Sequence, residues 1–392
     1  MALNTVSSDR LSTNVKNTNF TAAEKQDLTD DILPLAGQIG NRNLIINGAM
    51  QVAQRGTSST TNGYGTVDRF RVAHANTDEA PTQEQVDVAS GTTPYTLGFR
   101  KAFKLTNGNQ TSGAGTSDII YMLYTIEAQD VVNSGWNLLS SSSDITLSFW
   151  VKSSVSQNFF GNLISLDGTA QGFTYETGTL TANTWTKITK TIPGNSNIQI
   201  NNDNGGGLLL EFLIFRGTAQ TGSVTLNQWR TYDSSVRNPD MASTWYTTND
   251  ATFEITGVQL EVGSVATDFE HRSFGQELDL CRRYFQQISP STTDGVIALG
   301  NSWSSTLNKF VMYFNPNMRA IPTLNVNGTV RVRNASGSTQ LHSGASITLD
   351  EATTSVAQCR ATNTQGGLTA GNVGQVRLFG GTTEALQFTA EL

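Results

Sequence analysis

The stretch that decides the fold is residues 255–285, which read ITGVQLEVGSVATDFEHRSFGQELDLCRRYF. Up to Val262 the stretch has the two-residue alternation of a β-strand. From Ser273 onward it has the three- and four-residue spacing of a helix. The sequence therefore predicts that a β-domain closes here, that a helix follows it, and that a second β-rich region begins beyond the helix.

The strand half of this stretch contains a shift in its apolar phase. Phe253 and Ile255 are the apolar positions at its start, whereas beyond Thr256-Gly257 the apolar positions are Val258 and Leu260. A shift by one residue turns every later side chain to the other face of a sheet. A β-bulge adds one residue to a strand and restores the inward set. We therefore expect a bulge at Thr256-Gly257.

The helix half begins with a capping box, in which Ser273 and Gln276 satisfy each other's free backbone N–H groups. One turn apart, Asp279 and Arg283 are spaced to form an ion pair. Ser289-Pro290 is expected to end the helix, because the residue before proline is disfavoured in the α region. The apolar residues at four- and three-residue spacing define one helix stripe: Phe274, Leu278, Cys281, Phe285 and Ile288.

The composition bounds the class of protein. The 392 residues are 37% hydrophobic and 15% charged, and they include 36 glycines. This profile is typical of a turn-rich β protein. The net charge of −7 gives no electrostatic case for binding nucleic acid or an anionic membrane. No apolar run approaches the roughly 20 residues that a transmembrane helix requires.

Several separated motifs resemble a module found in bacteriophage tail-fibre and virion-appendage proteins. The central motif runs from Gly257 to Tyr284, and residues 43–56 with Asp68-Arg69-Phe70 resemble the opening of that module. Residues 318–323 and the terminal Ala390-Glu391-Leu392 resemble its C-terminal part. The motifs occur in the expected order over about residues 41–392. The sequence departs from the commoner pattern at Asp268, where the family has proline.

The resemblance implies a non-enzymatic virion protein without cofactors. It is expected to be made in the host cytoplasm and incorporated into the particle as a tail fibre or host-contacting spike. The order of motifs also resembles jelly-roll carbohydrate-binding modules, which implies a host surface glycan as the ligand. A homotrimer is implied as well, and the stripe from Phe274 to Ile288 offers a seam that neighbouring copies can share.

The sequence predicts four segments in a mainly all-β chain. Residues 1–40 contain a short helical segment, which we interpret as a peptide that docks on other virion proteins or as a free tail. Residues 41–272 are expected to form a jelly-roll β-sandwich, residues 273–290 the connecting helix, and residues 291–392 a smaller β-sandwich or a tip built from three chains.

Two strands of the larger domain are especially clear. Ile145 to Val151 alternates strictly between apolar and polar residues, as a half-buried strand does. Leu208 to Phe215 is apolar on both faces except at Glu211, as expected for a central strand with both faces covered.

Aromatic residues are the strongest signal for a binding site, because sugars stack on aromatic faces and loops carry ligand sites on rigid sandwiches. The alternative is that these rings are core or interface anchors, since aromatic side chains dominate protein cores. The candidates lie between predicted strands or near the start of the last domain: Trp229, Tyr232, Trp245, Tyr246 and Trp303.

Catalytic and metal signals are weak. The sequence has no phosphate-binding loop, nucleophile elbow or zinc-protease motif. His271 is interpreted as a structural hydrogen-bonding residue. Glu261, Asp268 and Glu270 are interpreted as turn and capping groups, because sequence clustering alone does not give the separation that a glycosidase needs. A Ca²⁺ site is left unassigned, since too few oxygen ligands can be named.

Three alternatives to a glycan-binding appendage remain open. The first is a purely structural appendage on head or tail, without receptor binding. The second is a capsular-polysaccharide depolymerase. The third is a free carbohydrate-binding module.

Overall fold

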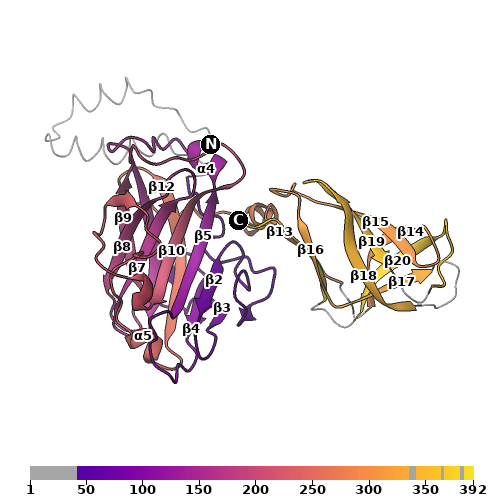
Figure 1. The fold of residues 1–392 in the computed structure, drawn as a ribbon, viewed down its shortest axis with the longest axis horizontal. Helices are drawn as coiled ribbons and strands as arrows, with labels where there is room; N and C mark the ends of the chain where they lie inside the picture. The colour runs from indigo at the N-terminus through magenta and orange to yellow at the C-terminus, as the bar shows by residue number, and fades with distance from the viewer. Residues whose placement is uncertain (1–41, 291, 293, 335–340, 363–365, 380–383) are drawn as a thin grey trace. The chain divides into compact units, whose positions relative to one another are not determined.

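The computed structural model describes residues 42–290, 292, 294–334, 341–362, 366–379 and 384–392 (Figure 1). The predicted docking segment, residues 1–40, lies outside the described residues. The described part of the chain consists mainly of antiparallel strands joined by loops and a few short helices. The predicted all-β fold is confirmed. No helix among the residues described is long and apolar enough to cross a membrane.

Two six-stranded antiparallel sheets form the jelly-roll sandwich (Figure 1). The β12 sheet has the order β1 (Ser58–Ser59), β3 (Thr82–Asp87), β4 (Lys101–Thr106), β12 (Thr252–Val262), β6 (Asp144–Ser153) and β9 (Thr186–Pro193). The β10 sheet has the order β11 (Trp229–Thr231), β8 (Gln171–Thr179), β7 (Asn158–Ser165), β10 (Gly206–Arg216), β5 (Ile119–Glu127) and β2 (Arg71–Ala75). Short helical turns connect them: α3 (Thr93–Thr96), α4 (Ala128–Val132), η1 (Thr218–Gln220) and α5 (Thr244–Thr247).

The core lies between the two sheets. From β6, the alternating residues predicted to share one face, including Leu147 and Phe149, are buried. From β10, Leu210 and Phe212 are buried in the same cluster, and the rings of Phe149 and Phe212 meet edge to face at 5.1 Å. As predicted, β10 is a central strand, since β7 pairs along one side of it and β5 along the other. The prediction that both of its faces are covered was wrong in part, because Leu209 and Glu211 on its outer face line surface hollows.

The predicted bulge in β12 is confirmed. Its register against β6 shifts between Thr256 and Gln259, and Gly257 has a φ of +63°. A side chain at Gly257 would be strained by this left-handed conformation, and its Cβ would lie 2.7 Å from the ring of Phe99. Val258 on the far side of the bulge is fully buried.

The connecting helix is shorter than predicted. Helix α6 spans Phe274–Arg282 and begins with the expected capping box between Ser273 and Gln276. The pairing of Asp279 with Arg283 was predicted wrongly: Asp279 lies 3.6 Å from Arg282 instead, on the exposed side of the helix. Arg283 points to the buried carboxylate of Glu127, with 2.6 Å between Nη2 and Oε1.

Residues 285–288, predicted as the last turn of that helix, form strand β13 (Phe285–Ile288). This strand pairs in register with β21 (Ala385–Thr389), and β16 (Thr323–Asn327) pairs along the other side of β21. The partner strand lies about 100 residues further along the chain. Spacing within a helix stripe cannot reveal so distant a partner, which is why the local pattern favoured the helix.

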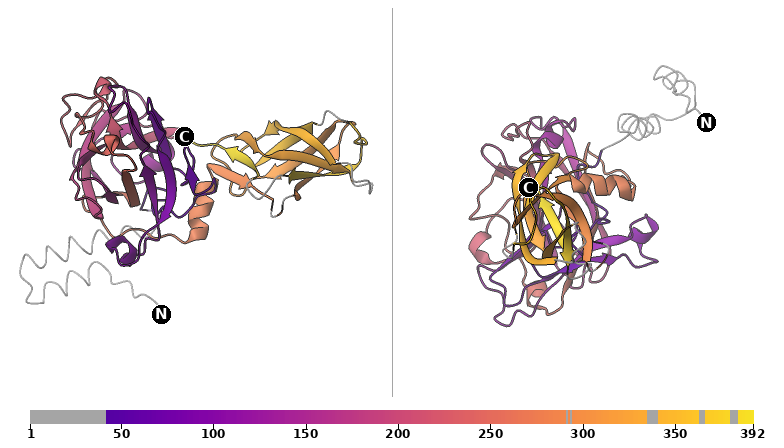
Figure 2. Two further views of the ribbon diagram at one scale, coloured as in Figure 1. Left: turned by 90° about the horizontal axis from the view of Figure 1, so that it is seen from below. Right: turned by 90° about the vertical axis from the view of Figure 1, so that its right-hand side faces the viewer.

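The C-terminal region is a closed six-stranded barrel, whereas the sequence predicted a smaller sandwich (Figure 2). The reason is that β20 pairs with both β14 and β17, so the sheet closes on itself and leaves no free edge. Around the barrel the order is β14 (Asp294–Ser302), β15 (Leu307–Tyr313), β19 (Val356–Thr362), β18 (Leu341–Ala352), β17 (Thr329–Asn334) and β20 (Val373–Phe379).

The motifs that carry the resemblance meet in a buried polar cluster. The guanidinium of Arg69 pairs with the carboxylate of Glu391 and lies 3.5 Å from the ring centroid of Tyr284. The Tyr284 hydroxyl donates to Glu127 at 2.7 Å. Nε of Arg319 donates to the carbonyl of Ala390 at 2.8 Å. Residues far apart in the sequence thus fasten the end of the chain to the sandwich.

Candidate functional site

The candidate site is the face of the β10 sheet that points away from the core. Side chains alternate along each strand, so every second residue of these strands is turned outward. Strand pairing aligns five outward residues in one row across β2, β5, β10, β7 and β8: Arg71, Leu123, Glu211, Asn162 and Thr174. We call these five residues, four polar and one leucine, the polar row.

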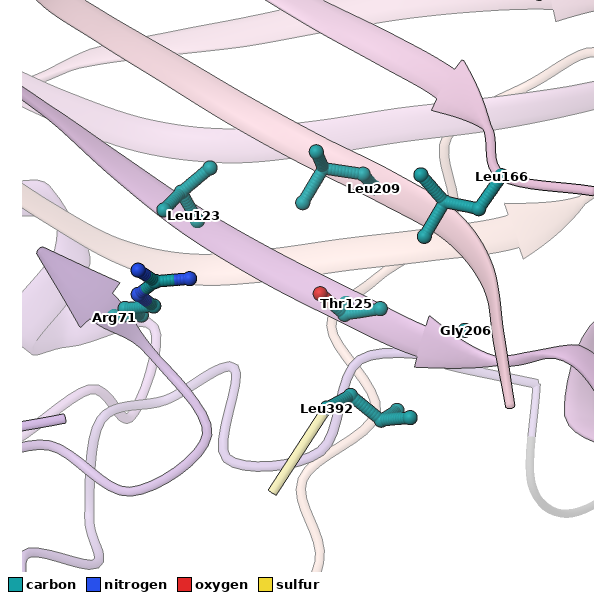
Figure 3. A pocket seen from close by; sticks show the side chains of 7 residues that line it. All are labelled: Arg71, Leu123, Thr125, Leu166, Gly206, Leu209 and Leu392. Carbon is teal, nitrogen blue, oxygen red and sulfur yellow. The ribbon is translucent and has the colours of Figure 1, made fainter. Parts of the chain in front are cut away.

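Two neighbouring hollows lie over this face. The first, of about 370 Å³, has Arg71 near one end and Leu166 with Gly206 at the other, and Leu392 lies beside it (Figure 3). The second, of about 360 Å³, shares Arg71 and Leu166 with the first and extends to Glu211. Because they share lining residues, the two hollows adjoin each other, and we refer to them together as the groove.

Glu211 lies at the floor of this groove. It is 2% exposed, and its Oε2 accepts a hydrogen bond of 2.8 Å from Nδ2 of Asn162. Asn162 and Thr174 are each 1% exposed, and neither Oδ1 of Asn162 nor Oγ1 of Thr174 has a partner among the described residues. Buried polar atoms normally find hydrogen-bond partners. The polar row thus keeps unused hydrogen-bonding capacity next to a carboxylate.

Two tyrosines line the groove beside Glu211. Tyr121 projects from β5, and Tyr232 follows the end of β11 and lies over Gly172 of β8. A Cβ on Gly172 would be 3.0 Å from Cδ2 of Tyr232, so a glycine at this position permits the close approach of the ring. Burial, reinforced by the negative charge of Glu211, raises the pKa of Tyr232 to about 12. Its hydroxyl therefore stays protonated at neutral pH and can donate as well as accept.

Arginines surround these tyrosines. The guanidinium carbons of Arg230 and Arg237 lie 6.0 and 5.9 Å from the ring centroid of Tyr232. The guanidinium carbon of Arg216 lies 4.8 Å from the ring centroid of Tyr121. These contacts fix the rings from the side and add positive charge near Glu211.

Of the five aromatic candidates from the sequence, Tyr232 is the one that the structure places in the groove. Trp245 and Tyr246 are buried in the core at 0% and 1% exposure, so neither ring face is accessible to a sugar. Trp229 lies at the edge of the β10 sheet on its core side, where its ring packs against Phe173. Trp303 is 63% exposed, and Nζ of Lys309 in the barrel lies 4.4 Å from its ring centroid.

The residues of the predicted helix stripe have largely found partners within the chain. Cys281 and Phe285 are buried, and Leu278 packs against the sandwich core. Ile288 packs against the C-terminal apolar cluster, which includes Leu386 on the neighbouring strand β21, while Phe274 is 56% exposed. Exposed large apolar residues also occur on three adjacent barrel strands: Val296, Leu299, Val311, Tyr313, Val373 and Phe379.

The acidic and histidine candidates occupy structural positions. Both carboxylate oxygens of Glu261 accept hydrogen bonds from Thr267, at 2.9 and 2.6 Å. Nε2 of His271 lies 2.9 Å from the carbonyl oxygen of Leu97. In the described part of the chain, no group of three or more histidine, cysteine or acidic residues is arranged to hold a metal ion.

Sequence reasoning missed the groove. It noted Glu211 as the one charged residue in an apolar strand but did not assign it a role. Neither Tyr121 nor Asn162 was singled out, because their meeting depends on the order and register of three strands. The sequence did contain one signal for the groove, namely a single carboxylate in an otherwise apolar central strand. Burying a carboxylate costs free energy unless it is paired or has a function.

Comparisons with known proteins give weak similarities. No protein-family model matches the chain, and no curated protein matches it. Among solved structures, the enzymatically active domain of bacteriophage CBA120 tailspike protein 4 is 12% identical, with a TM-score of 0.31, covering 57% of this chain and 22% of that chain. The present chain thus spans less than a quarter of that tailspike chain.

Carbohydrate-binding modules are also among the similar structures. A family 11 module from Clostridium thermocellum, in complex with a β-1,3-1,4-mixed-linked tetrasaccharide, is 10% identical, with a TM-score of 0.24. It covers 54% of this chain and 98% of that chain. The CBM22-1 xylan-binding domain from Paenibacillus barcinonensis Xyn10C is 10% identical, with a TM-score of 0.25, covering 54% and 94%. These TM-scores are too low to establish a shared fold, so the function must be argued from the groove itself.

Proposed function

We propose that this protein binds a glycan in the groove over the β10 sheet. The observation that carries the proposal is the grouping of Glu211, Tyr121 and Tyr232 in one hollow over the sheet, with the Glu211 carboxylate held by Nδ2 of Asn162. A sugar presents hydroxyl groups at its edge and C–H groups on its faces. A carboxylate can accept hydrogen bonds from the hydroxyls, and an aromatic ring can cover an apolar face.

The biological setting that we propose is a virion appendage that contacts the host surface. This part of the proposal rests on the resemblance of the separated motifs to tail-fibre proteins. In the structure Arg69 contacts both Tyr284 and Glu391, so residues from three of these motifs meet in the buried polar cluster. A purely structural appendage shares that cluster but has no use for the groove.

Binding without cleavage is the third part of the proposal. Most glycosidases place two carboxyl groups across the scissile bond. Among the described residues that line the groove, Glu211 supplies the one carboxylate side chain. This supports a binding protein over a depolymerase.

The test is a binding measurement with polysaccharide purified from the host surface. Wild-type protein is expected to bind it, and Glu211→Gln is expected to weaken binding about tenfold or more, because a hydrogen bond to a charged group contributes about 1.5–3 kcal/mol. Glu84→Gln is the matched control, since Glu84 lies in the β12 sheet and pairs with Lys104 there. Its affinity should equal that of wild type.

Two results would count against this proposal. If Glu211→Gln binds the polysaccharide with unchanged affinity and has an unchanged melting temperature, the glycan does not bind at Glu211. Shortened polysaccharide chains after incubation with wild-type protein would establish an enzyme.

We also propose that the protein is a homotrimer that joins the particle through residues 1–40, as the resemblance implies. A chain that begins at Asn41 is expected to fold with an unchanged melting temperature and to keep a trimer mass in light scattering. It is expected not to be incorporated into particles. A monomer mass for the full chain at micromolar concentration would contradict the trimer, and normal incorporation of the shortened chain would contradict the docking role.

A further inference from the structure

The side chains that line the groove carry a net charge opposite in sign to that of the whole chain. The protein carries a net charge of −7. The charged side chains that line the two hollows, among the described residues, are Arg71 and Arg237 against Glu211. Arg216 lies beside the groove, above the ring of Tyr121. Positive charge is therefore concentrated at this place on an otherwise acidic protein.

These arginines are incompletely used within the chain. The guanidinium of Arg71 is exposed and makes no hydrogen bond or ion pair with any residue that the structure describes. Nη1 of Arg216 donates to Gln220 at 2.7 Å, but its Nε and Nη2 have no partner in the described chain, although the side chain is 1% exposed. Burial lowers the pKa of Arg216. A buried guanidinium with two unpaired N–H groups is costly, unless a ligand or water completes its hydrogen bonds.

The placement of the two lining arginines fits a ligand that carries both hydroxyls and an anionic group. Arg71 lies on β2 at one edge of the β10 sheet, and Arg237 follows β11 at the other edge. Leu123 stands between Arg71 and Glu211 in the polar row, so these two charges do not neutralise each other by direct contact. Arg237 uses its Nε to donate to the carbonyl of Ser234 at 3.1 Å. The guanidinium of Arg71 and the Nη groups of Arg237 remain available to an outside anion, while Glu211 remains available to hydroxyl groups.

We propose that the glycan bound in this groove is acidic, with its anionic groups paired to Arg71 and Arg237 and its hydroxyls bonded to Glu211. This inference rests on the proposed function and names the class of saccharide. Planar carboxylates suit the two-pronged geometry of a guanidinium, and sulfate or phosphate substituents offer the same chemistry. A neutral glycan would leave both arginines without a counter-charge.

The test compares one acidic polysaccharide with its own carboxyl-reduced form, which has the same backbone and linkages but no charge. Oligosaccharides of a hexuronic acid, the reduced oligosaccharides and a sulfated neutral oligosaccharide serve as probes. The acidic forms are expected to bind wild-type protein at least about tenfold more tightly than the reduced form, with affinity falling as salt is raised. Comparison of the carboxylated and sulfated probes identifies the preferred anion.

Substitutions of the arginines then test whether these residues cause the preference for acidic oligosaccharides. The double variant Arg71→Gln/Arg237→Gln is expected to lose most of this preference, so that its affinities for the acidic and the reduced oligosaccharides become nearly equal. Arg100→Gln is the control, because Arg100 is exposed, directly precedes β4 of the other sheet and lines neither hollow. Arg71→Gln alone serves if the double variant has a lowered melting temperature, since the Arg71 side chain is exposed.

The outcomes separate the two proposals. Equal affinity of wild type for acidic and reduced oligosaccharides overturns the acidic ligand and leaves the glycan-binding groove in place. A preference that survives unchanged in the arginine variants also overturns it. Absence of binding to every probe and to the host polysaccharide overturns the proposed function itself.

Discussion

Glu391→Ala is expected to lower the free energy of unfolding by about 3–5 kcal/mol, the cost of removing one partner from a buried ion pair. The side chains of Arg69 and Glu391 are 1% and 6% exposed, so water cannot replace the lost carboxylate. The second oxygen of Glu391 lies 3.1 Å from Nη2 of Arg55. The substitution therefore removes the carboxylate that pairs with Arg69 and leaves Arg55 with Asp68, at 3.7 Å, as its carboxylate partner.

Other contacts keep Arg69 in place when its partner is removed. Its Nη2 donates to the carbonyl of Thr125 at 2.8 Å, and its guanidinium carbon lies 3.5 Å from the ring centroid of Tyr284. Because these contacts hold the cation in the interior, the cost is not relieved by simple movement into solvent. The loss is expected in both thermal and denaturant unfolding.

The matched control for this prediction is Asp279→Ala. Asp279 belongs to an exposed pair with Arg282 on helix α6, with side chains 64% and 42% exposed. Exposed pairs contribute about 0–1 kcal/mol, so little change is expected. If Glu391→Ala were no more destabilising than Asp279→Ala, the buried polar cluster would not be what fastens the end of the chain.

Trp229 and Tyr232 are expected to respond to truncation in opposite ways. Trp229→Ala should lower the free energy of unfolding by at least about 2 kcal/mol, because its ring packs against Phe173 and its Nε1 donates to the carbonyl of Pro193 at 2.6 Å. Glycan affinity should change little. Tyr232→Ala should weaken glycan binding by about 2 kcal/mol, or roughly thirtyfold, through the loss of a stacked ring and a hydroxyl contact.

The measurements are isothermal titration with the bound polysaccharide and thermal unfolding of both variants. Tyr232→Phe is a second comparison, since it keeps the ring and removes the hydroxyl. It is expected to lose less affinity than Tyr232→Ala. A Tyr232→Ala protein that binds as wild type would show that the ring takes no part in recognition.

The sequence predicted features that depend on neighbouring residues. The bulge at Thr256-Gly257 follows from a shift of one residue in the apolar pattern, and the cap at Ser273 follows from a spacing of three. Both signals lie within one turn or one strand. The central position of β10 was also predictable, because its residues are apolar on both faces.

Features that depend on distant partners could not be predicted in this way. Phe285 continues the helix stripe in sequence, but its backbone pairs with β21 instead. The closure of the barrel depends on β20 pairing with two strands that are themselves far apart in the sequence. Local spacing contains no information about either event.

The candidate site was predictable only in part from the sequence. Trp229 and Tyr232 are three residues apart, an odd spacing that places them on opposite faces of an extended segment. That signal was available and identifies one of them as core. It does not say which one, and the assignment required the register of β11 against β8. The polar row around Glu211 required the order of five strands.

The most direct test of the glycan-binding groove is a crystal structure of the protein with a fragment of the host polysaccharide bound. The fragment is expected to lie across the β10 sheet, with a sugar face on the ring of Tyr232 and hydroxyl groups within hydrogen-bond distance of Glu211. A fragment bound instead at Trp303 on the barrel, or in the hollow beside His271 and Phe269, would contradict the account.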